Sequence, residues 1–232
     1  MDTIPATGFL WFIAFLFSTT VHEAMHAFVA WKGGDPTAYH GGQVSLSPLP
    51  HIKREPIGMV IVPLLTSLTQ GWAMGWASAP YDPEWALRYP RRAAVMAAAG
   101  PAGNLAIATI AFAAIKAGLA LGWFTSPDSA SFDLLVEAAV PAAGFAATAL
   151  SILVVMNVFL ALFNLLPLPP LDGFSVLGLV LPERYAASVQ AFHANGATSM
   201  VGLVIAWRVF PLFTNPLFSL LLKLVHPGES YS

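Results

Sequence analysis

The sequence predicts an all-α polytopic membrane protein: a bundle of about four to six transmembrane helices with a short membrane-associated β-hairpin and a re-entrant segment. Of its 232 residues, 57% are hydrophobic and only 9% are charged, and the mean hydropathy is +0.70. A typical soluble domain has about a quarter of its residues charged. Because a soluble protein of this size needs more polar surface, the composition favours a single membrane-embedded domain over residues 1–232.

Four stretches approach or exceed the roughly 20 apolar residues that cross a bilayer core. They are residues 7–31, 93–117, 138–166 and 197–222. We expect the first to be a retained helix, because Asp2 stands where a signal peptide carries basic residues.

A fifth uncharged run, residues 56–81, is long enough to span but contains Pro63, Gly71 and Gly75. We expect it to re-enter the membrane from one side, since irregular backbone is tolerated there against protein or a watery cavity. Ahead of it, Gly41 to Ser47 alternate polar and apolar residues, which predicts a short strand or hairpin. Residues 118–137 are more polar and predict a loop.

Charge and cysteine content exclude two kinds of chemistry. The net charge of -2 provides no basic field of the kind that nucleic-acid binding needs, so we expect no nucleic-acid partner. The chain has no cysteine, so disulfides and thiolate metal sites are excluded. Any bound metal must therefore use His, Asp or Glu.

An H-E-x-x-H motif, His22 to His26, lies inside the first apolar stretch. Two histidines four residues apart project from the same helix face, so both can bind one metal ion. Glu23 is rotated off that face and can take a proton from a water whose pKa a catalytic zinc lowers to about 7. The alternative is that these side chains only hydrogen-bond their neighbours, but ionisable groups within membrane spans are costly and usually functional.

A catalytic zinc takes three protein ligands, and the residues directly after His26 include no third histidine. Asp172 is the candidate, because it follows a 34-residue uncharged run whose last prolines stop the preceding helix. A carboxylate that follows so long an uncharged run needs an interaction partner. The alternative is that Asp172 caps a helix at the membrane surface.

The sequence resembles the site-2 protease family of intramembrane zinc metalloproteases, in its compact bacterial form without PDZ or CBS modules. Three motifs in the family's order carry the resemblance: the His22 to His26 motif, Ala99 to Asn104, and Asn164 to Gly173. One departure is the segment from His51 to Pro56, where compact relatives have a shorter link.

The resemblance implies that His22, His26 and Asp172 hold one zinc ion per chain. It implies that Glu23 is the catalytic acid and base. The substrate implied is a transmembrane protein cut within or near its helix in the lipid bilayer, as in regulated intramembrane proteolysis.

The resemblance also places Asn104 and Asn164 near the scissile bond, where their amides could hold the substrate backbone or the oxyanion. From the sequence alone, either asparagine could instead only hydrogen-bond across a helix interface. For the substrate, we hypothesise an unwound chain that pairs with a strand at Gln43 to Ser47.

Basic residues flank the re-entrant run, whereas residues 118–137 contain no Lys or Arg. The positive-inside rule then places the active site toward the cytoplasm, in a bacterial or archaeal cell membrane. The alternative function is a membrane metal transporter or metal-binding protein, although no internal repeat typical of transporters is visible. A membrane-anchored zincin that cleaves soluble chains is a further alternative, but the sequence contains no soluble domain for its third ligand.

Overall fold

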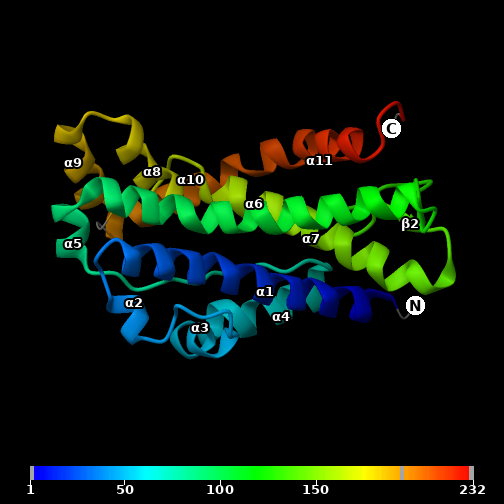
Figure 1. Cartoon of the computed structure of the whole chain (residues 1–232), viewed down its shortest axis with the longest axis horizontal. Coiled ribbons are helices and arrows are strands. Elements are labelled where there is room, and N and C mark those ends of the chain that lie inside the picture. Colours follow the sequence, from blue (N-terminus) through cyan, green and yellow to red (C-terminus); the bar gives the residue numbers. More distant parts are fainter. Residues whose placement is uncertain (1–2, 194–195, 230–232) are drawn as a thin grey trace.

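The computed structural model describes residues 3–193 and 196–229, so the ends of the predicted domain at 1–2 and 230–232 lie outside the described residues. Three long helices form the centre of the bundle (Figure 1). They are α1 (Thr3–Lys32), α6 (Pro90–Ala120) and α7 (Gly144–Asn164). All three pack against one another, and all are long and apolar enough to cross a membrane.

The fourth predicted span, 197–222, is a broken pair of helices. They are α10 (Gly196–Val209) and α11 (Pro211–Val225), bent by 49° relative to each other. Pro211 has no N–H and disfavours a helical backbone at the residue before it, so the break falls at Phe210. The described part of the chain therefore has three helices long and apolar enough to span a membrane, or four candidate spans if the bent pair crosses as one.

The run 56–81 doubles back on itself. A π-helical turn η1 (Ile57–Ile61) continues into α4 (Val62–Gln70). The two elements together are shorter than a spanning helix. Gly71 then reverses the chain with a left-handed φ of 78°. The following residues form an extended run, 72–82, that returns along α4 and α1 (Figure 1), and the Trp76 N–H donates to the Gly58 carbonyl at 3.1 Å. This is the geometry expected of a re-entrant segment.

The strand predicted over Gly41–Ser47 is wrong, because these residues form turns and bends. The Gln43 N–H donates back to the Ala38 carbonyl, and Gly42 has a φ of 73°. Ser47 accepts from the Leu49 N–H and so caps the next helix. Local turn and capping bonds thus use the groups that a strand would pair.

The small two-stranded sheet lies in the predicted loop instead, at the other end of the bundle. It pairs β1 (Phe124–Thr125) with β2 (Glu137–Ala138) antiparallel, and the 3-10 helix η2 (Pro141–Ala143) leads from it into α7.

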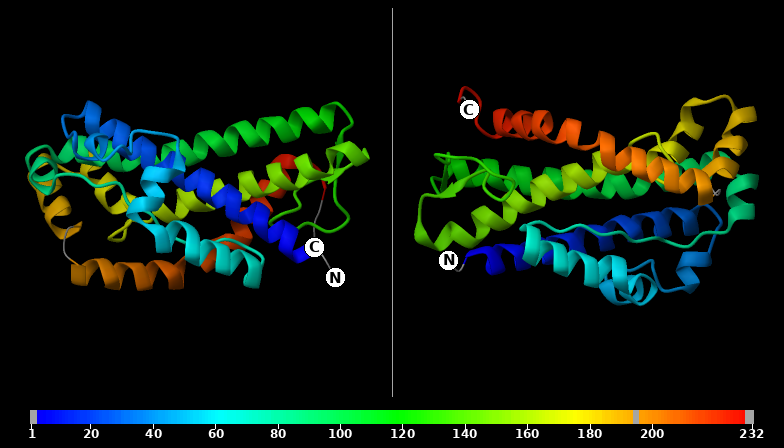
Figure 2. Two further views of the ribbon diagram at one scale, coloured as in Figure 1. Left: turned by 90° about the horizontal axis from the view of Figure 1, so that it is seen from below. Right: turned by 180° about the vertical axis from the view of Figure 1, so that it is seen from behind.

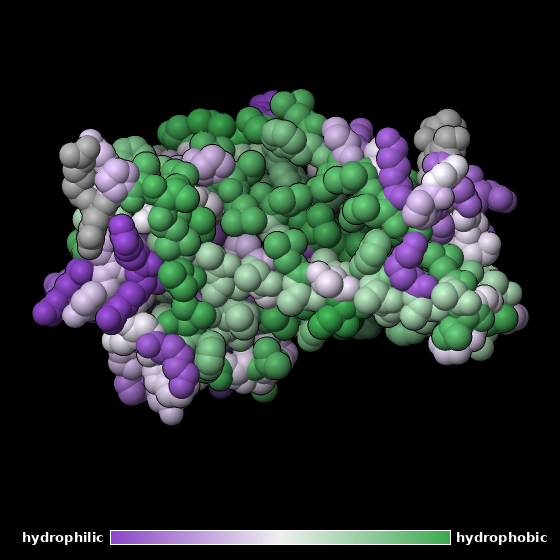
Figure 3. All heavy atoms as spheres, turned by 45° about the horizontal axis from the view of Figure 1, so that its top comes forward, coloured by the Kyte–Doolittle hydropathy of each residue, from purple (hydrophilic) through white to green (hydrophobic). Residues whose placement is uncertain are grey.

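Short helices gather at the end of the bundle opposite the sheet (Figures 1 and 2). They are α2 (Thr37–His40), α3 (Pro48–Arg54), α5 (Pro83–Arg88), α8 (Asp172–Val180) and α9 (Glu183–His193). The two ends carry most of the hydrophilic surface in the view of Figure 3, and a mostly apolar band lies between them. This distribution is that of an integral membrane protein.

Small residues let α1 and α6 approach closely at the centre of the bundle. Ala93, Ala97 and Gly100 of α6 are buried, as are Ala27 and Ala30 of α1. Small side chains at a helix interface bring the two backbones close, which is the usual packing in membranes. The close approach brings the histidine face of α1 against α6.

Candidate active site

His22 and His26 lie one turn apart on α1, and their side chains point to the same place. Both residues are buried, with 5% and 7% of their surface exposed. Their Nε2 atoms are 2.9 Å apart. The predicted helical face therefore exists and turns inward.

Asp172 reaches this pair from the start of α8. Its Oδ2 lies 3.1 Å from Nε2 of His22 and 3.3 Å from Nε2 of His26. The chain can turn here because Gly173 has no side chain: a Cβ on it would overlap the backbone of Leu165. The three predicted metal ligands are thus brought together from two elements 150 residues apart.

The outer ring nitrogens of both histidines are already bonded. Nδ1 of His22 donates to Oδ1 of Asn104 at 2.6 Å, and Nδ1 of His26 donates to the Met96 carbonyl at 2.8 Å. In a neutral imidazole the other nitrogen, Nε2, then carries a lone pair. Hydrogen bonds of this kind at the outer ring nitrogen orient metal-binding histidines.

Two lone pairs and a carboxylate oxygen therefore face one another in a buried space. Such a set needs a positive charge between its members. Ligands about 2.0–2.1 Å from a tetrahedral zinc stand about 3.3 Å apart, which is close to the distances between His22, His26 and Asp172. The donor set fits a zinc ion with one position left open.

Gly100 of α6 leaves the space in which an ion would sit. A Cβ on Gly100 would stand within 2.5 Å of the Nε2 atoms of both His22 and His26. This explains a glycine in the Ala99 to Asn104 motif, because any larger residue would fill the gap between the histidines.

A buried polar network holds Asn104 in place. Its Nδ2 donates to Oδ1 of Asn157 on α7 at 2.9 Å and to the Ser18 carbonyl on α1 at 3.3 Å. Nδ2 of Asn157 in turn donates to Oγ of Ser18 at 2.9 Å. Both asparagines are fully buried. The structure therefore places Asn104 behind His22, where it orients the ring.

Glu23, the acidic residue of the H-E-x-x-H motif, lies beside His22, His26 and Asp172. It is buried, with 5% of its surface exposed, and its Oε2 has no hydrogen-bond partner in the described part of the chain. A buried carboxylate oxygen without a partner is costly. Its position beside the His–His–Asp cluster leaves that oxygen available for a water or a substrate.

A cavity of about 170 Å³ opens onto these groups. Glu23, both histidines and Asp172 line it, and so does Asn164, whose Nδ2 donates to the Leu160 carbonyl. Asn104 does not line it. The two asparagines predicted to act near the scissile bond thus occupy different places: one faces the cavity and one lies behind a histidine.

The extended run forms one wall of the cavity through Ala77, Ser78 and Ala79, and Tyr81 adds to it. Burial raises the pKa of the Tyr81 phenol above its usual range, so it stays protonated and can donate. The run is held in place where Oγ of Ser78 donates to Oε1 of Glu55 at 2.7 Å.

A comparison with protein families decides what kind of site this is. The sequence model of peptidase family M50 matches residues 10–208, which is most of the chain. The chain belongs to peptidase family M50. The resemblance to site-2 proteases is thereby confirmed, and the chain is a zinc metalloprotease of that type.

Curated relatives of this M50 chain carry matching names. It is 33% identical to "Putative zinc metalloprotease YwhC" of Bacillus subtilis (strain 168), over 79% of this chain and 74% of that protein. It is 28% identical to "Putative zinc metalloprotease Rip2" of Mycolicibacterium smegmatis and 32% identical to the protein of that name from Mycobacterium tuberculosis (strain H37Rv). Both of these matches cover 76% of this chain and 59% of the relative. No solved structure matches the chain.

Sequence reasoning missed two residues at the candidate site. Asn157 gives no signal in the sequence beyond being an asparagine in an apolar helix, and only packing shows that it bonds Asn104. Gln190 lines the cavity from α9, is 5% exposed, and has no partner for its Nε2 in the described residues. Helix α9 is the polar surface helix that sequence patterns would place outside the site.

Proposed function

We propose that this protein is a zinc-dependent intramembrane endopeptidase that hydrolyses a peptide bond within or near a transmembrane helix of a membrane-protein substrate. One observation carries the proposal. Three residues with potential metal-ligand atoms line one cavity inside a bundle of apolar helices, and Glu23 lines it too, with a carboxylate oxygen that has no hydrogen-bond partner among the described residues.

His22 and His26 would hold one zinc ion per chain through Nε2, and Asp172 would hold it through a carboxylate oxygen. When bound, zinc polarises a carbonyl oxygen and lowers the pKa of a water to about 7. Asn104 and the Met96 carbonyl keep both Nε2 atoms directed at the ion by occupying the Nδ1 protons.

Glu23 would act as the general base and then the general acid. Its free Oε2 accepts the proton of the attacking water and later gives that proton to the leaving amine nitrogen. Burial keeps bulk water away from this carboxylate, so the transferred proton stays in the site.

Gln190 and Asn164 would bind the substrate backbone. Gln190 has a buried amide nitrogen with no partner in the described residues, so a substrate carbonyl can accept from it without displacing another bond. An amide donor aimed at a carbonyl that becomes an oxyanion stabilises the transition state. Asn164 lines the same cavity and has a second amide proton beyond the one given to Leu160.

The extended run offers a path for an unwound substrate. Its Met74 and Trp76 N–H groups are bonded toward α4 and η1, whereas the N–H groups of Ala77 and Ala79 have no partner in the part of the chain that the structure describes. Alternate residues of an extended chain face opposite edges. The free edge beside the cavity can pair with a substrate strand, a role first expected for Gln43 to Ser47.

The active site would lie toward the cytoplasm of a bacterial or archaeal cell. Lys32, Lys53, Arg54, Arg88, Arg91 and Arg92 lie on the segments at the same end of the bundle as the cavity. The positive-inside rule places such an end on the cytoplasmic face.

The test measures metal and cleavage together on full-length protein purified in detergent. Zinc is counted by mass spectrometry, and cleavage is scored as new N-termini in a mixture of solubilised membrane-protein fragments. Wild type should carry one zinc and produce new termini. Glu23→Gln should keep the zinc and produce no new termini, because glutamine has the shape of glutamate but cannot act as the base. Asp172→Ala should lose the zinc.

Three results would contradict the proposal. Cleavage by Glu23→Gln would remove the assigned role of the base. Full zinc content in Asp172→Ala would place the third ligand elsewhere. Zinc bound by wild type with no Glu23-dependent cleavage would favour the alternative, a membrane metal transporter or metal-binding protein.

A further inference from the structure

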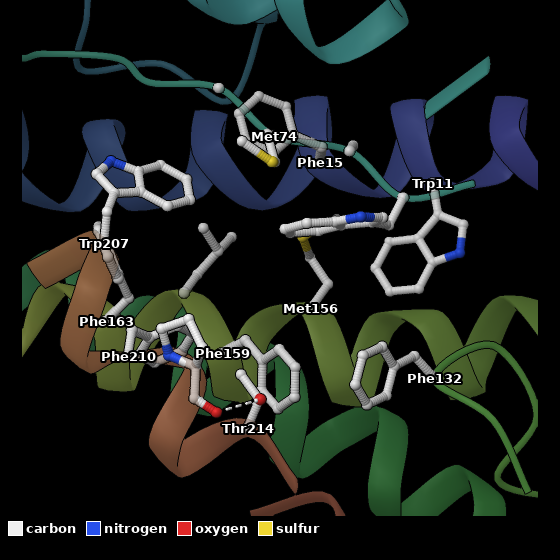
Figure 4. A pocket seen from close by; sticks show the side chains of 15 residues that line it. Trp11, Phe15, Met74, Phe132, Met156, Phe159, Phe163, Trp207, Phe210 and Thr214 are labelled. Carbon is white, nitrogen blue, oxygen red and sulfur yellow. Dashed lines mark hydrogen bonds between the residues drawn. The ribbon is translucent and has the colours of Figure 1, made fainter. Parts of the chain in front are cut away.

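A second cavity, of about 270 Å³, lies beside the first and is almost entirely apolar. Figure 4 shows its walls: Trp11 and Phe15 come from α1, Met74 from the extended run, and Met156 and Phe163 from α7. Trp207 closes one side from α10. The M50 chemistry described above uses none of these side chains.

The apolar cavity and the metal cavity share two walls. On the extended run, residues 72–75 line the apolar cavity and residues 77–79 line the metal cavity. On α7, Phe159, Leu160 and Phe163 line the first, and Asn164 lines the second. A chain that lies along the run beside the metal cavity must therefore pass the apolar one.

Two elements give the spacing between the cavities. From Gly75 to Ser78 the extended run covers about 10 Å at about 3.3 Å per residue. From Phe15 to His22 the α1 helix covers about 10 Å at 1.5 Å per residue. The two estimates agree, and about 10 Å corresponds to about three residues of an extended substrate.

The walls fit one large apolar side chain. Trp11, Phe15 and Met156 are buried and form a fixed floor, whereas Trp72 and Trp207 are 41% and 42% exposed and form the open side. The volume is below the range of about 300–1,000 Å³ that is usual for a drug-sized ligand. A rigid aromatic pocket of this size suits the side chain of Phe, Leu, Ile or Met.

We propose that this apolar cavity is a specificity pocket that binds one large apolar side chain of the substrate, about three residues from the scissile bond. The inference rests on the proposed function. It adds a requirement that the metal site does not impose, since the metal site and Glu23 would act only on the peptide backbone of the substrate. A lipid acyl chain is the competing occupant, and the experiment separates the two.

The experiment profiles cleavage positions on full-length, zinc-loaded protein in detergent. The probe is a peptide library made by digesting bacterial membrane proteins, and the products are sequenced by mass spectrometry. Two variants change the pocket: Ala73→Leu fills it, and Trp207→Ala widens its open side. Trp207 is partly exposed, so that variant should fold even if Ala73→Leu does not. The matched control is Ile110→Ala, at a 71% exposed position of α6 outside the cavity.

Wild type should favour large apolar residues over alanine by about tenfold or more at one position, two to four residues from the cut. Ala73→Leu should shift that position toward small residues, Trp207→Ala should broaden it, and Ile110→Ala should leave it unchanged. Zinc content should be equal in all four proteins.

Wild-type cleavage without a positional preference, or a preference that neither pocket variant changes, would overturn this inference and leave the proposed protease intact. A lipid retained by wild type in native mass spectrometry and lost in Ala73→Leu would assign the cavity to an acyl chain. Absence of any Glu23-dependent cleavage would remove the proposed function and this inference together.

Discussion

Nδ1 of His22 lies 2.6 Å from Oδ1 of Asn104, and both residues are buried between α1 and α6. The amide fixes the imidazole tautomer that leaves Nε2 free for a metal. Asn104 is itself held by Asn157 and Ser18. The candidate metal site is therefore supported by a buried hydrogen-bond network whose members do not line the cavity.

Replacing Asn104 with Ala should weaken zinc binding by about 10- to 100-fold, because His22 loses the acceptor that orients its ring. Competition with a chelator of known affinity measures the change. The control is Thr109→Ala on an exposed turn of the same helix. Unchanged zinc affinity in Asn104→Ala would show that the ring is oriented by other contacts.

Gly100→Ala should abolish zinc binding, since its Cβ would stand within 2.5 Å of both Nε2 atoms. Gly103→Ala is the matched control on the same helix: its Cβ would meet side-chain atoms of Met25 at 3.0 Å, which can move, and of Val21 at 3.5 Å, which is ordinary contact. Metal content per chain distinguishes them. If Gly100→Ala keeps its zinc, the ion does not lie between the histidines.

Gln190→Leu should lower kcat by about 100-fold, the usual effect of losing one oxyanion donor, and should leave zinc content unchanged. Leucine keeps the bulk of the side chain and removes the donor. Ser188→Ala, exposed on the same helix, provides the comparison. A change confined to KM would assign Gln190 to ground-state binding of the substrate instead.

Asp35→Ala should destabilise the end of the bundle that carries the site, by about 1–3 kcal/mol for the unsatisfied groups it leaves. The buried Asp35 carboxylate accepts from the Thr37 N–H and hydroxyl and from the Asp82 N–H, and so joins the turn between α1 and α2 to the end of the extended run. Thermal unfolding in detergent measures the loss. Asp128→Ala, exposed in the opposite loop, should unfold as wild type does.

The cluster of His22, His26 and Asp172 could be predicted from the sequence because its signals are local or rare. His22 and His26 share a helix face by spacing alone, and an acid after a long uncharged run stands out because burying a charge is costly. The same reasoning located the three long helices from their apolar length, and it predicted an irregular, re-entrant run over residues 56–81 from Pro63, Gly71 and Gly75; the structure then showed that the chain reverses at Gly71.

Most other contacts between distant segments could not be predicted in this way. The alternation from Gly41 to Ser47 is typical of a strand, but bonds to Ala38 and the cap of α3 take its backbone and side-chain groups. Asn104 lies behind His22 and not beside the cavity, because the packing of α6 on α1 decides which way the amide points.

The sequence by itself determined a membrane bundle, the helix face shared by His22 and His26 with Glu23 beside it, and the candidate acid Asp172, because composition and periodicity act within one segment. Only the tertiary structure decided that the extended run lines the cavity, that Gln190 joins it from a surface helix, and that an aromatic pocket lies about 10 Å away. The reason is physical: side-chain periodicity fixes a face of one helix, whereas a cavity exists only where several faces fail to close against one another.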